Sequence, residues 1–183
     1  MKIAAINAVP YGSTARIMVD IARIAEENGH VCMTFSGYST HPAPFMPSRH
    51  RVIGGFFQKA LHLLLAKLTG YAGKYSVVAP MRLLKRLAQE KIECVHLHNL
   101  HGWYLNLPML FHWVKKNRIK VIWTLHDCWP FTGHCPHFDM IDCQKWQKGC
   151  FSCPQYRAYP ESFFDNSKFM YRLKKNGLLV LMI

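Results

Sequence analysis

The spacing of hydrophobic and polar residues near the N-terminus predicts a strand, a helix and a second strand. Short apolar runs at residues 3–8 and 31–36 have the length of buried strands. Between them, Ile17, Ile21 and Ile24 recur at intervals that place them on one face of a helix. A strand, a glycine-containing turn, a helix and a strand in this order are typical of a parallel α/β sheet.

The same periods return in the second half of the chain. Two short apolar runs flank a helix-like pattern that has Pro108 in its first turn. Residues 126–160 show no period and are rich in Cys, His, Pro and aromatic residues, which suggests a functional or ligand-stapled loop. The further expected elements are helices at residues 53–68 and 79–89, a strand at 92–97, a helix carrying Leu107, Leu110, Phe111 and Val114, a strand at 119–125 and a helix at 162–175.

Composition adds a size limit and a charge. The 183 residues suit one globular domain with a long excursion and exclude a fibrous repeat or a disordered chain. The 23 Lys and Arg exceed the 10 Asp and Glu by 13, and residues 28–89 contain no acidic residue. Such a region favours a negative partner, and polyphosphate, nucleic acid and an anionic membrane surface all satisfy it.

The N-terminus lacks the pattern of a signal peptide, and polar residues interrupt the longest apolar stretch, 52–68. We therefore expect a cytoplasmic protein. In that stretch, Phe56, Phe57 and several leucines alternate with Lys59, His62 and Lys67. The pattern fits an amphipathic helix on anionic lipid and equally fits a core helix with a solvated basic side.

Polar clusters follow three of the predicted strands, where ligands bind in parallel sheets. They are Gly12-Ser13-Thr14, with Ser13 as the expected N-cap, then His96-Leu97-His98-Asn99 with His101, and His126-Asp127. We expect His98 to lie nearest the crevice, where a neutral imidazole donates to a phosphate or sugar hydroxyl. Asp127 either sets the tautomer of His126 or caps the next turn. No dinucleotide or P-loop glycine pattern is present, so ATP or GTP hydrolysis is disfavoured.

The excursion also holds a cysteine cluster, Cys135, Cys143, Cys150 and Cys153, of which the last two have Cys-x-x-Cys spacing. A structural zinc site and a set of reduced thiols in an aromatic loop are the two alternatives. A catalytic thiol is disfavoured because no nucleophile signature accompanies it.

These clusters resemble bacterial family 4 glycosyltransferases of the GT-B fold, in particular those of colanic-acid-type exopolysaccharide synthesis. The resemblance runs from Ile3 to about Lys175 and is most specific in the middle block. It rests on Ile6-Asn7 with Gly12-Ser13-Thr14-Ala15-Arg16-Ile17, on His96 to Gly102, on Trp123-Thr124-Leu125-His126-Asp127-Cys128-Trp129-Pro130-Phe131-Thr132-Gly133-His134-Cys135, on Cys150-Phe151-Ser152-Cys153-Pro154-Gln155 and on Asp165-Asn166-Ser167.

The resemblance implies that residues 1–175 form the Rossmann-like, acceptor-side half of a GT-B enzyme, with helices on both faces of the sheet and the Cys-rich excursion at 126–160. Such enzymes move a sugar from a nucleotide sugar to a lipid-linked saccharide at the cytoplasmic membrane face, with no metal in the catalytic step. Carried over, His98, His126 and Asp127 are the catalytic candidates. Gly12, Ser13, Thr14, Asn99 and His101 are the acceptor-side candidates.

Residues 176–183 depart from the family pattern, and no donor-binding domain or donor-site glutamate pair follows Lys175. We therefore expect an N-terminal part of a glycosyltransferase that does not turn over alone. A separately encoded donor domain is one alternative. A non-catalytic basic module for anionic lipid or nucleic acid is another, with nucleic acid disfavoured because no named motif is present.

Overall fold

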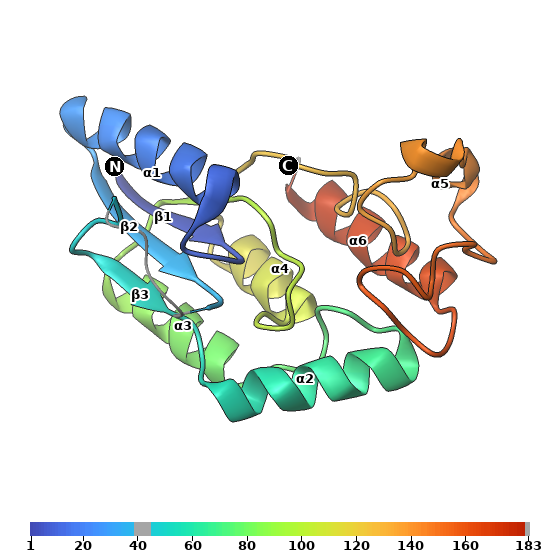
Figure 1. The fold of residues 1–183 in the computed structure, drawn as a ribbon. Coiled ribbons are helices and arrows are strands. Elements are labelled where there is room, and N and C mark those ends of the chain that lie inside the picture. The colour runs from blue at the N-terminus through green and yellow to red at the C-terminus, as the bar shows by residue number, and fades with distance from the viewer. Residues whose placement is uncertain (39–44, 182–183) are drawn as a thin grey trace.

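The computed structural model describes residues 1–38 and 45–181 and centres on a sheet of parallel strands (Figure 1). Along the sheet the order is β3-β2-β1-β4-β5, and every neighbouring pair is parallel. This is the strand order of a Rossmann-like fold, so the predicted fold class is confirmed. The strands are β1 (Lys2–Asn7), β2 (Val31–Ser36), β3 (His50–Val52), β4 (Cys94–Leu97) and β5 (Lys120–Trp123).

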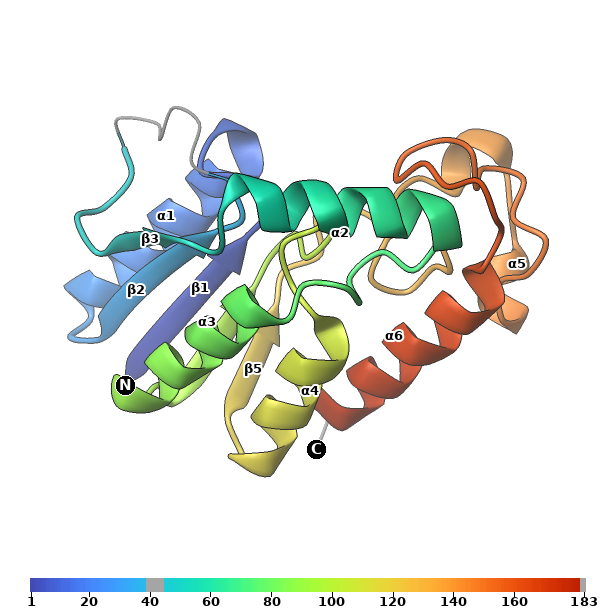
Figure 2. The ribbon, with the colours of Figure 1, turned by 90° about the horizontal axis from the view of Figure 1, so that it is seen from below.

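Helices cover both faces of this sheet. Figures 1 and 2 show α1 (Gly12–Glu27) on one face and α3 (Val78–Gln89) with α4 (Leu107–Lys116) on the other. Helix α6 (Ser167–Leu181) packs against α4. Helix α2 (Phe56–Thr69) runs beyond the ends of the strands, from β3 toward the Cys-rich excursion (Figure 2). That excursion contains the short 3-10 helix η1 (Asp139–Ile141) and α5 (Lys145–Lys148).

The core lies mainly between the sheet and α3 with α4. β1 and β4 contribute fully buried Ile6, Val95 and Leu97. Central strands covered on both faces carry continuous apolar runs because neither side meets water. Leu107 and Leu110 of α4 complete this layer, and Trp129 of the excursion packs against it. The excursion is thereby fixed to the core.

On the other face, α1 turns its small residues inward. Ala15, Met18 and Ala22 are buried, whereas Ile17, Ile21 and Ile24 are at least 38% exposed. The isoleucines do share one helical face, but this face points away from the sheet. The two alanines allow the helix to approach the strands closely, and Met18 is the large side chain on the inner face, while the isoleucines lie outside.

Several predicted boundaries were wrong. β3 was not predicted, because its three residues are only partly covered, and α2 begins at Phe56 rather than at residue 53. Ser13 is not the N-cap of α1: Tyr11 takes that position without a side-chain cap. Helix α6 begins at Ser167 and continues to Leu181, so residues 176–181 extend a helix, while 182 and 183 lie outside the described residues. Within the described residues, no helix has both the length and the apolarity needed to cross a bilayer.

Candidate functional site

The three predicted polar clusters meet at one edge of the sheet. β1, β4 and β5 are neighbours, and Ile6 pairs with Leu97, which pairs with Trp123. The residues that follow these strands therefore lie side by side at the carboxyl edge. This is the position where ligands bind in open α/β sheets.

Asn7, at the end of β1, links two of these clusters. Its side chain is fully buried. Its amide nitrogen donates to the Val9 carbonyl at 3.0 Å and to Thr14 Oγ1 at 3.1 Å, and its Oδ1 accepts from the backbone N–H of Asn99 at 3.2 Å. Asn7 was not among the predicted site residues. The available signal was its position, as a polar residue that ends an apolar strand.

His98 lies inside the protein rather than facing the crevice. It is 0% exposed, and its Nδ1 lies 2.9 Å from Nε2 of His126. Burial first, then the nearby rings of His96 and His126, lowers the pKa of His98 to about 3, so it is neutral at physiological pH. The prediction that His98 is nearest the crevice was wrong, because the chain after β5 brings His126 over it.

His126 is the outer member of this pair. Its side chain is half-buried, and burial lowers its pKa while the charge of Asp127 opposes the shift. His96, on the inner side, has its ring centroid 4.2 Å from that of His98, and its Nε2 lies 2.8 Å from Thr124 Oγ1. His96, His98 and His126 thus form a row of three neutral imidazoles, and His126 is the outermost of them.

Asp127 caps the next turn, as one of the two predicted alternatives has it, and also bonds a histidine other than His126. Its Oδ2 lies 2.8 Å from Nε2 of His101, and its Oδ1 accepts from the Trp129 backbone N–H at 2.9 Å. Burial tends to raise the pKa of Asp127, but the bond from His101 and the Trp129 N–H leave it below its usual value. The capping alternative is correct, and the carboxylate orients His101 rather than His126.

His101 is held from its other side by a residue that the sequence did not indicate. Its Nδ1 lies 2.8 Å from the hydroxyl of Tyr159, near the end of the excursion. Tyr159, His101 and Asp127 therefore form a chain of side chains along the edge. Since Tyr159 is far from both partners in sequence, only the folded structure reveals this link.

The turn that contains Gly12 presents mainly backbone atoms, rather than side chains, at the edge of the sheet. Gly12 has φ of +76°, and a Cβ added to it meets no atom within 4 Å. Ser13 is exposed, and Thr14 is turned toward Asn7. Of this predicted cluster, Gly12 and Ser13 lie on open surface, while Thr14 supports the loop.

The four predicted cysteines converge within the excursion. Cys135, Cys143, Cys150 and Cys153 line one apolar cavity of about 10 Å³. All are free thiols, and a hydrogen bond from Cys153 lowers the pKa of the Cys135 thiol. In the described parts of the chain, no three His, Cys, Asp or Glu side chains are arranged to hold a metal ion. Structural zinc therefore stays a prediction, which a zinc determination on the purified protein separates from reduced thiols.

A buried lysine holds the start of the excursion. Lys174 of α6 is 0% exposed, its Nζ donates to the Trp129 carbonyl at 2.6 Å, and the same atom lies 3.9 Å from the centre of the Trp129 ring. Burial lowers the pKa of Lys174 to about 7, against the attraction of nearby thiols and Asp127. No pattern in the sequence predicted this contact.

Comparison with known proteins adds the functional class. Over 78 residues the chain is 35% identical to the putative colanic acid biosynthesis glycosyl transferase WcaC of Escherichia coli K12. The chain resembles a glycosyltransferase. The matched segment covers 40% of this chain and 19% of that relative, so the chain spans about a fifth of the relative's length where they align. No protein-family model matches the chain.

The resemblance inferred from the motifs is thus confirmed by a relative. The similarity to a glycosyltransferase is consistent with the parallel α/β sheet. The polar edge after β1, β4 and β5 is a suitable place for a sugar or phosphate group. The histidines, Asp127 and the glycine turn at this edge are candidates for a functional site.

Proposed function

We propose that this chain forms the acceptor-side, GT-B-type half of a glycosyltransferase that acts in exopolysaccharide or other cell-surface polysaccharide synthesis. In the reaction proposed, a sugar passes from a nucleotide sugar to a lipid-linked saccharide. The similarity to a putative colanic acid biosynthesis glycosyl transferase supports the reaction class. The edge formed after β1, β4 and β5 supports the place of binding.

The pairing of His98 with His126 carries the proposal. His98 Nε2 is buried and has no hydrogen-bond partner among the residues that the structure describes. An orphaned buried N–H is rarer than an orphaned acceptor, so we assign the His98 proton to Nδ1, which then donates to Nε2 of His126. Neutral His126 then carries its own proton on Nδ1.

This tautomer gives His126 a defined role. Its Nδ1–H donates to an oxygen of the bound sugar or diphosphate, while His98 fixes the ring from behind. Asp127 and Tyr159 orient His101 beside it, and Gly12 with Ser13 allows the acceptor to approach the backbone. The hydrogen bonding proposed for these residues does not involve a bound metal ion.

The same proposal places the protein at the inner face of the cytoplasmic membrane, with α2 as the contact. Phe56 and Phe57 are 79% and 87% exposed, and Leu61, Leu64 and Leu68 continue the exposed stripe. Lys59 and His62 instead point inward. Lys59 lies over the ring of Tyr38, and His62 bonds Ser76.

This orientation reverses that of an ordinary soluble helix. The apolar face of α2 is outside, in a region whose residues 28–89 carry eight basic and no acidic side chains. An exposed apolar helix face in a basic part of the chain fits the interface of an anionic bilayer. Phe163 and Phe164, 57% and 63% exposed, adjoin its far end, where the Phe163 N–H donates to the Lys67 carbonyl.

A binding experiment on the intact chain tests the acceptor site. The probe is a short-chain prenyl diphosphate bearing one sugar, followed through the histidine ring signals in NMR spectra. We expect the His126 signal to shift on titration and His126→Ala to weaken binding about tenfold, as for loss of one hydrogen bond to a charged group. The matched control His112→Ala, on an exposed part of α4, should bind like the wild type.

Equal binding by His126→Ala and wild type, or an unshifted His126 signal, would contradict the assignment. A transfer assay with a panel of nucleotide sugars completes the test. It compares the chain alone with material co-purified from its native cells. Transfer only by the co-purified material would support a separately encoded donor domain.

A further inference from the structure

Two aromatic side chains lie next to the histidine edge, and their rings have no role in the function proposed above. Trp103 follows β4, and Tyr159 stands near the end of the Cys-rich excursion. Their ring centroids are 5.8 Å apart, at an interplanar angle of 78°. The ring of Tyr159 also meets that of His101 edge to face, at 5.5 Å. The two rings therefore adjoin the chain of side chains that leads through His101 to Asp127.

The backbone at Trp103 is held in a conformation that bulky residues rarely adopt. Trp103 has φ of +62° and follows Gly102, which has φ of +115°. The Tyr38 hydroxyl donates to the Gly102 carbonyl at 2.9 Å, which ties this turn in place. Ser76 Oγ donates to the Trp103 carbonyl at 3.4 Å. Strained backbone persists where surrounding contacts fix it, and it is concentrated at ligand sites. Here it holds a half-buried indole beside Tyr159.

Tyr159 is enclosed at its hydroxyl but remains exposed elsewhere. Its hydroxyl lies 2.8 Å from Nδ1 of His101. Burial first, then the neighbouring Tyr38 and the charge of Asp127, raises the pKa of Tyr159 to about 12. The residue as a whole is nevertheless 47% exposed. Because the hydroxyl lies among these groups, the exposed area belongs to the rest of the residue, including its ring.

The hydrogen bonds of this chain leave the Tyr159 oxygen able to accept. A carboxylate only accepts, so we assign the proton of His101 to Nε2, which faces Asp127. Nδ1 of the neutral imidazole then accepts from the Tyr159 hydroxyl. The lone pairs of the Tyr159 oxygen remain for a donor on a ligand. Tyr159 thus combines apolar ring surface with a polar acceptor at its end.

The chemistry of this pair selects a carbohydrate. A pyranose ring has C–H groups on its faces and hydroxyl groups around its rim, so it fits an aromatic surface that has polar groups at its border. Two other rings near this edge are already covered by cations. Lys59 Nζ lies 5.0 Å from the centre of the Tyr38 ring. Lys174 Nζ lies 3.9 Å from the centre of the Trp129 ring.

We propose that Trp103 and Tyr159 form a sugar-binding subsite, in which the two rings pack against the sugar of the acceptor. This inference rests on the proposed function and names the part of the acceptor that these residues bind. The Tyr159 oxygen accepts a hydrogen bond from a sugar hydroxyl. His126 is then left for the diphosphate.

Two probes separate the sugar from the diphosphate. They are farnesyl diphosphate and the same compound carrying one glucose on its terminal phosphate. In calorimetric titration, the wild type should bind the glucose-bearing probe about tenfold more tightly, for one ring contact and one hydrogen bond. Trp103→Ala should reduce this ratio to about twofold or less and change binding of farnesyl diphosphate less than about twofold. Tyr159→Phe keeps the ring and loses the acceptor, so a ratio of about threefold should remain.

A variant and a spectroscopic signal guard against a Trp103→Ala protein that folds poorly. Trp103→Phe keeps a smaller ring and should give a ratio between those of Trp103→Ala and the wild type. In the wild type, the indole N–H signal of Trp103 in NMR spectra should shift with the glucose-bearing probe and stay in place with farnesyl diphosphate. Phe151→Ala removes an exposed ring of the excursion outside the pair, so this matched control should keep the wild-type ratio.

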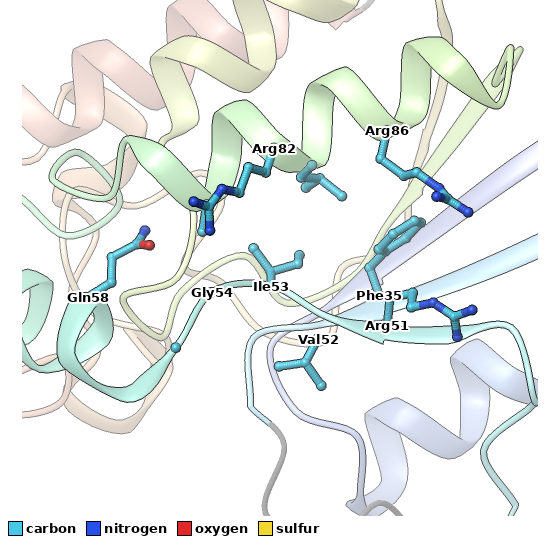
Figure 3. Close-up of a pocket in the computed structure, with 11 residues that line it drawn as sticks. Phe35, Arg51, Val52, Ile53, Gly54, Gln58, Arg82 and Arg86 are labelled. Carbon is cyan, nitrogen blue, oxygen red and sulfur yellow. The ribbon is translucent and has the colours of Figure 1, made fainter.

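The pocket between β3 and α3, of about 410 Å³, supplies a control for charge (Figure 3). Arg82 points toward Gln58 at one end, whereas Arg51 and Arg86 lie toward the other (Figure 3). These separated charges attract anions in general. Arg82→Gln should therefore change the binding of both probes by the same factor and leave their ratio unchanged. His126→Ala should likewise weaken both probes equally.

The outcomes distinguish this subsite from the diphosphate site. Equal affinity of the wild type for the two probes would overturn the subsite and leave the proposed diphosphate site standing. A wild-type ratio in folded Trp103→Ala, or an unshifted Trp103 signal, would do the same. Binding of neither probe would overturn both proposals.

Discussion

Nδ1 of His98 lies 2.9 Å from Nε2 of His126, so a fully buried imidazole supports a half-buried one at the edge of the sheet. Neither ring bonds the carboxylate of Asp127, whose partner is His101. The orientation of His126 is therefore set by a neutral neighbour. A neutral support keeps His126 a donor without adding charge to the site.

Acid should destabilise the protein through His98. The pKa of His98 is about 3 in the folded protein, against about 6.5 in an unfolded chain. Only the unfolded state then binds this proton between these values, so stability is complete above pH 6.5 and is lost as the pH falls toward 3. His98→Gln should be about 1 kcal/mol less stable at pH 7.5, for its lost hydrogen bond, and this deficit should vanish and then reverse as the pH falls toward 4, because only the wild type loses the contribution of His98.

Urea unfolding at several pH values measures this trend. The matched control is His112→Gln, which changes an exposed histidine of α4 and should follow the wild type at each pH. A constant deficit for His98→Gln between pH 7.5 and pH 4 would show that His98 is not the group responsible.

Lys174 should give the same trend in a higher pH range. Its pKa is about 7 when folded and about 10.5 when unfolded, so the unfolded state binds more protons between these values and stability rises with pH there. From pH 6 to pH 8 this contributes about 1 kcal/mol to the wild type, and the contribution is absent in Lys174→Met. Thermal unfolding at both pH values measures the difference. Lys175→Met, an exposed neighbour, should keep the wild-type dependence.

Membrane binding should depend on the first turn of α2. Replacing both Phe56 and Phe57 by serine removes the two most exposed aromatic side chains, and we expect vesicle binding to weaken tenfold or more, on the order of 2 kcal/mol. Flotation with vesicles containing phosphatidylglycerol measures it. Ile24→Ser removes a 50% exposed side chain from α1, a helix that also carries acidic residues, and should have little effect. Equal losses in both variants would rule out α2 as the contact.

The packing of the Cys-rich excursion should be sensitive at Gly133. A Cβ there would lie 2.5 Å from the Ser167 carbonyl oxygen and 2.7 Å from Cys150 Cβ. Gly133→Ala should therefore lower the free energy of unfolding by about 1–3 kcal/mol, as overpacking does. Gly55→Ala, whose Cβ meets nothing within 4 Å, should be tolerated. Chemical denaturation of the two variants gives the comparison, and equal stabilities would show that the excursion adapts.

The sheet was predictable because its strands are buried runs in the central positions. β2, β4 and β5 lie within the predicted ranges and β1 begins one residue before its range, whereas β3 has only partly covered residues and no apolar run. A strand of three mostly exposed residues leaves no apolar run to detect, whereas β5, at the other edge, has one.

The site was predictable only as three separate clusters. Which histidine is buried, and which one Asp127 meets, depends on partners such as Tyr159 that are distant in sequence. The direction of α2 likewise depends on Tyr38 and Ser76, which give Lys59 and His62 internal partners. Contacts between residues that are distant in sequence cannot be predicted from the local spacing of apolar and polar residues.

The far end of α2 is fixed by contacts with the last part of the chain. The Asn166 side chain donates to the Thr69 carbonyl, a link that spans 97 residues, and Lys67 pairs with Glu161. Contacts this distant in sequence form late, after most of the chain has been synthesised. During translation, α2 therefore leaves the ribosome well before its anchor exists. Its exposed phenylalanines are then available to chaperones or to the membrane before the domain is complete.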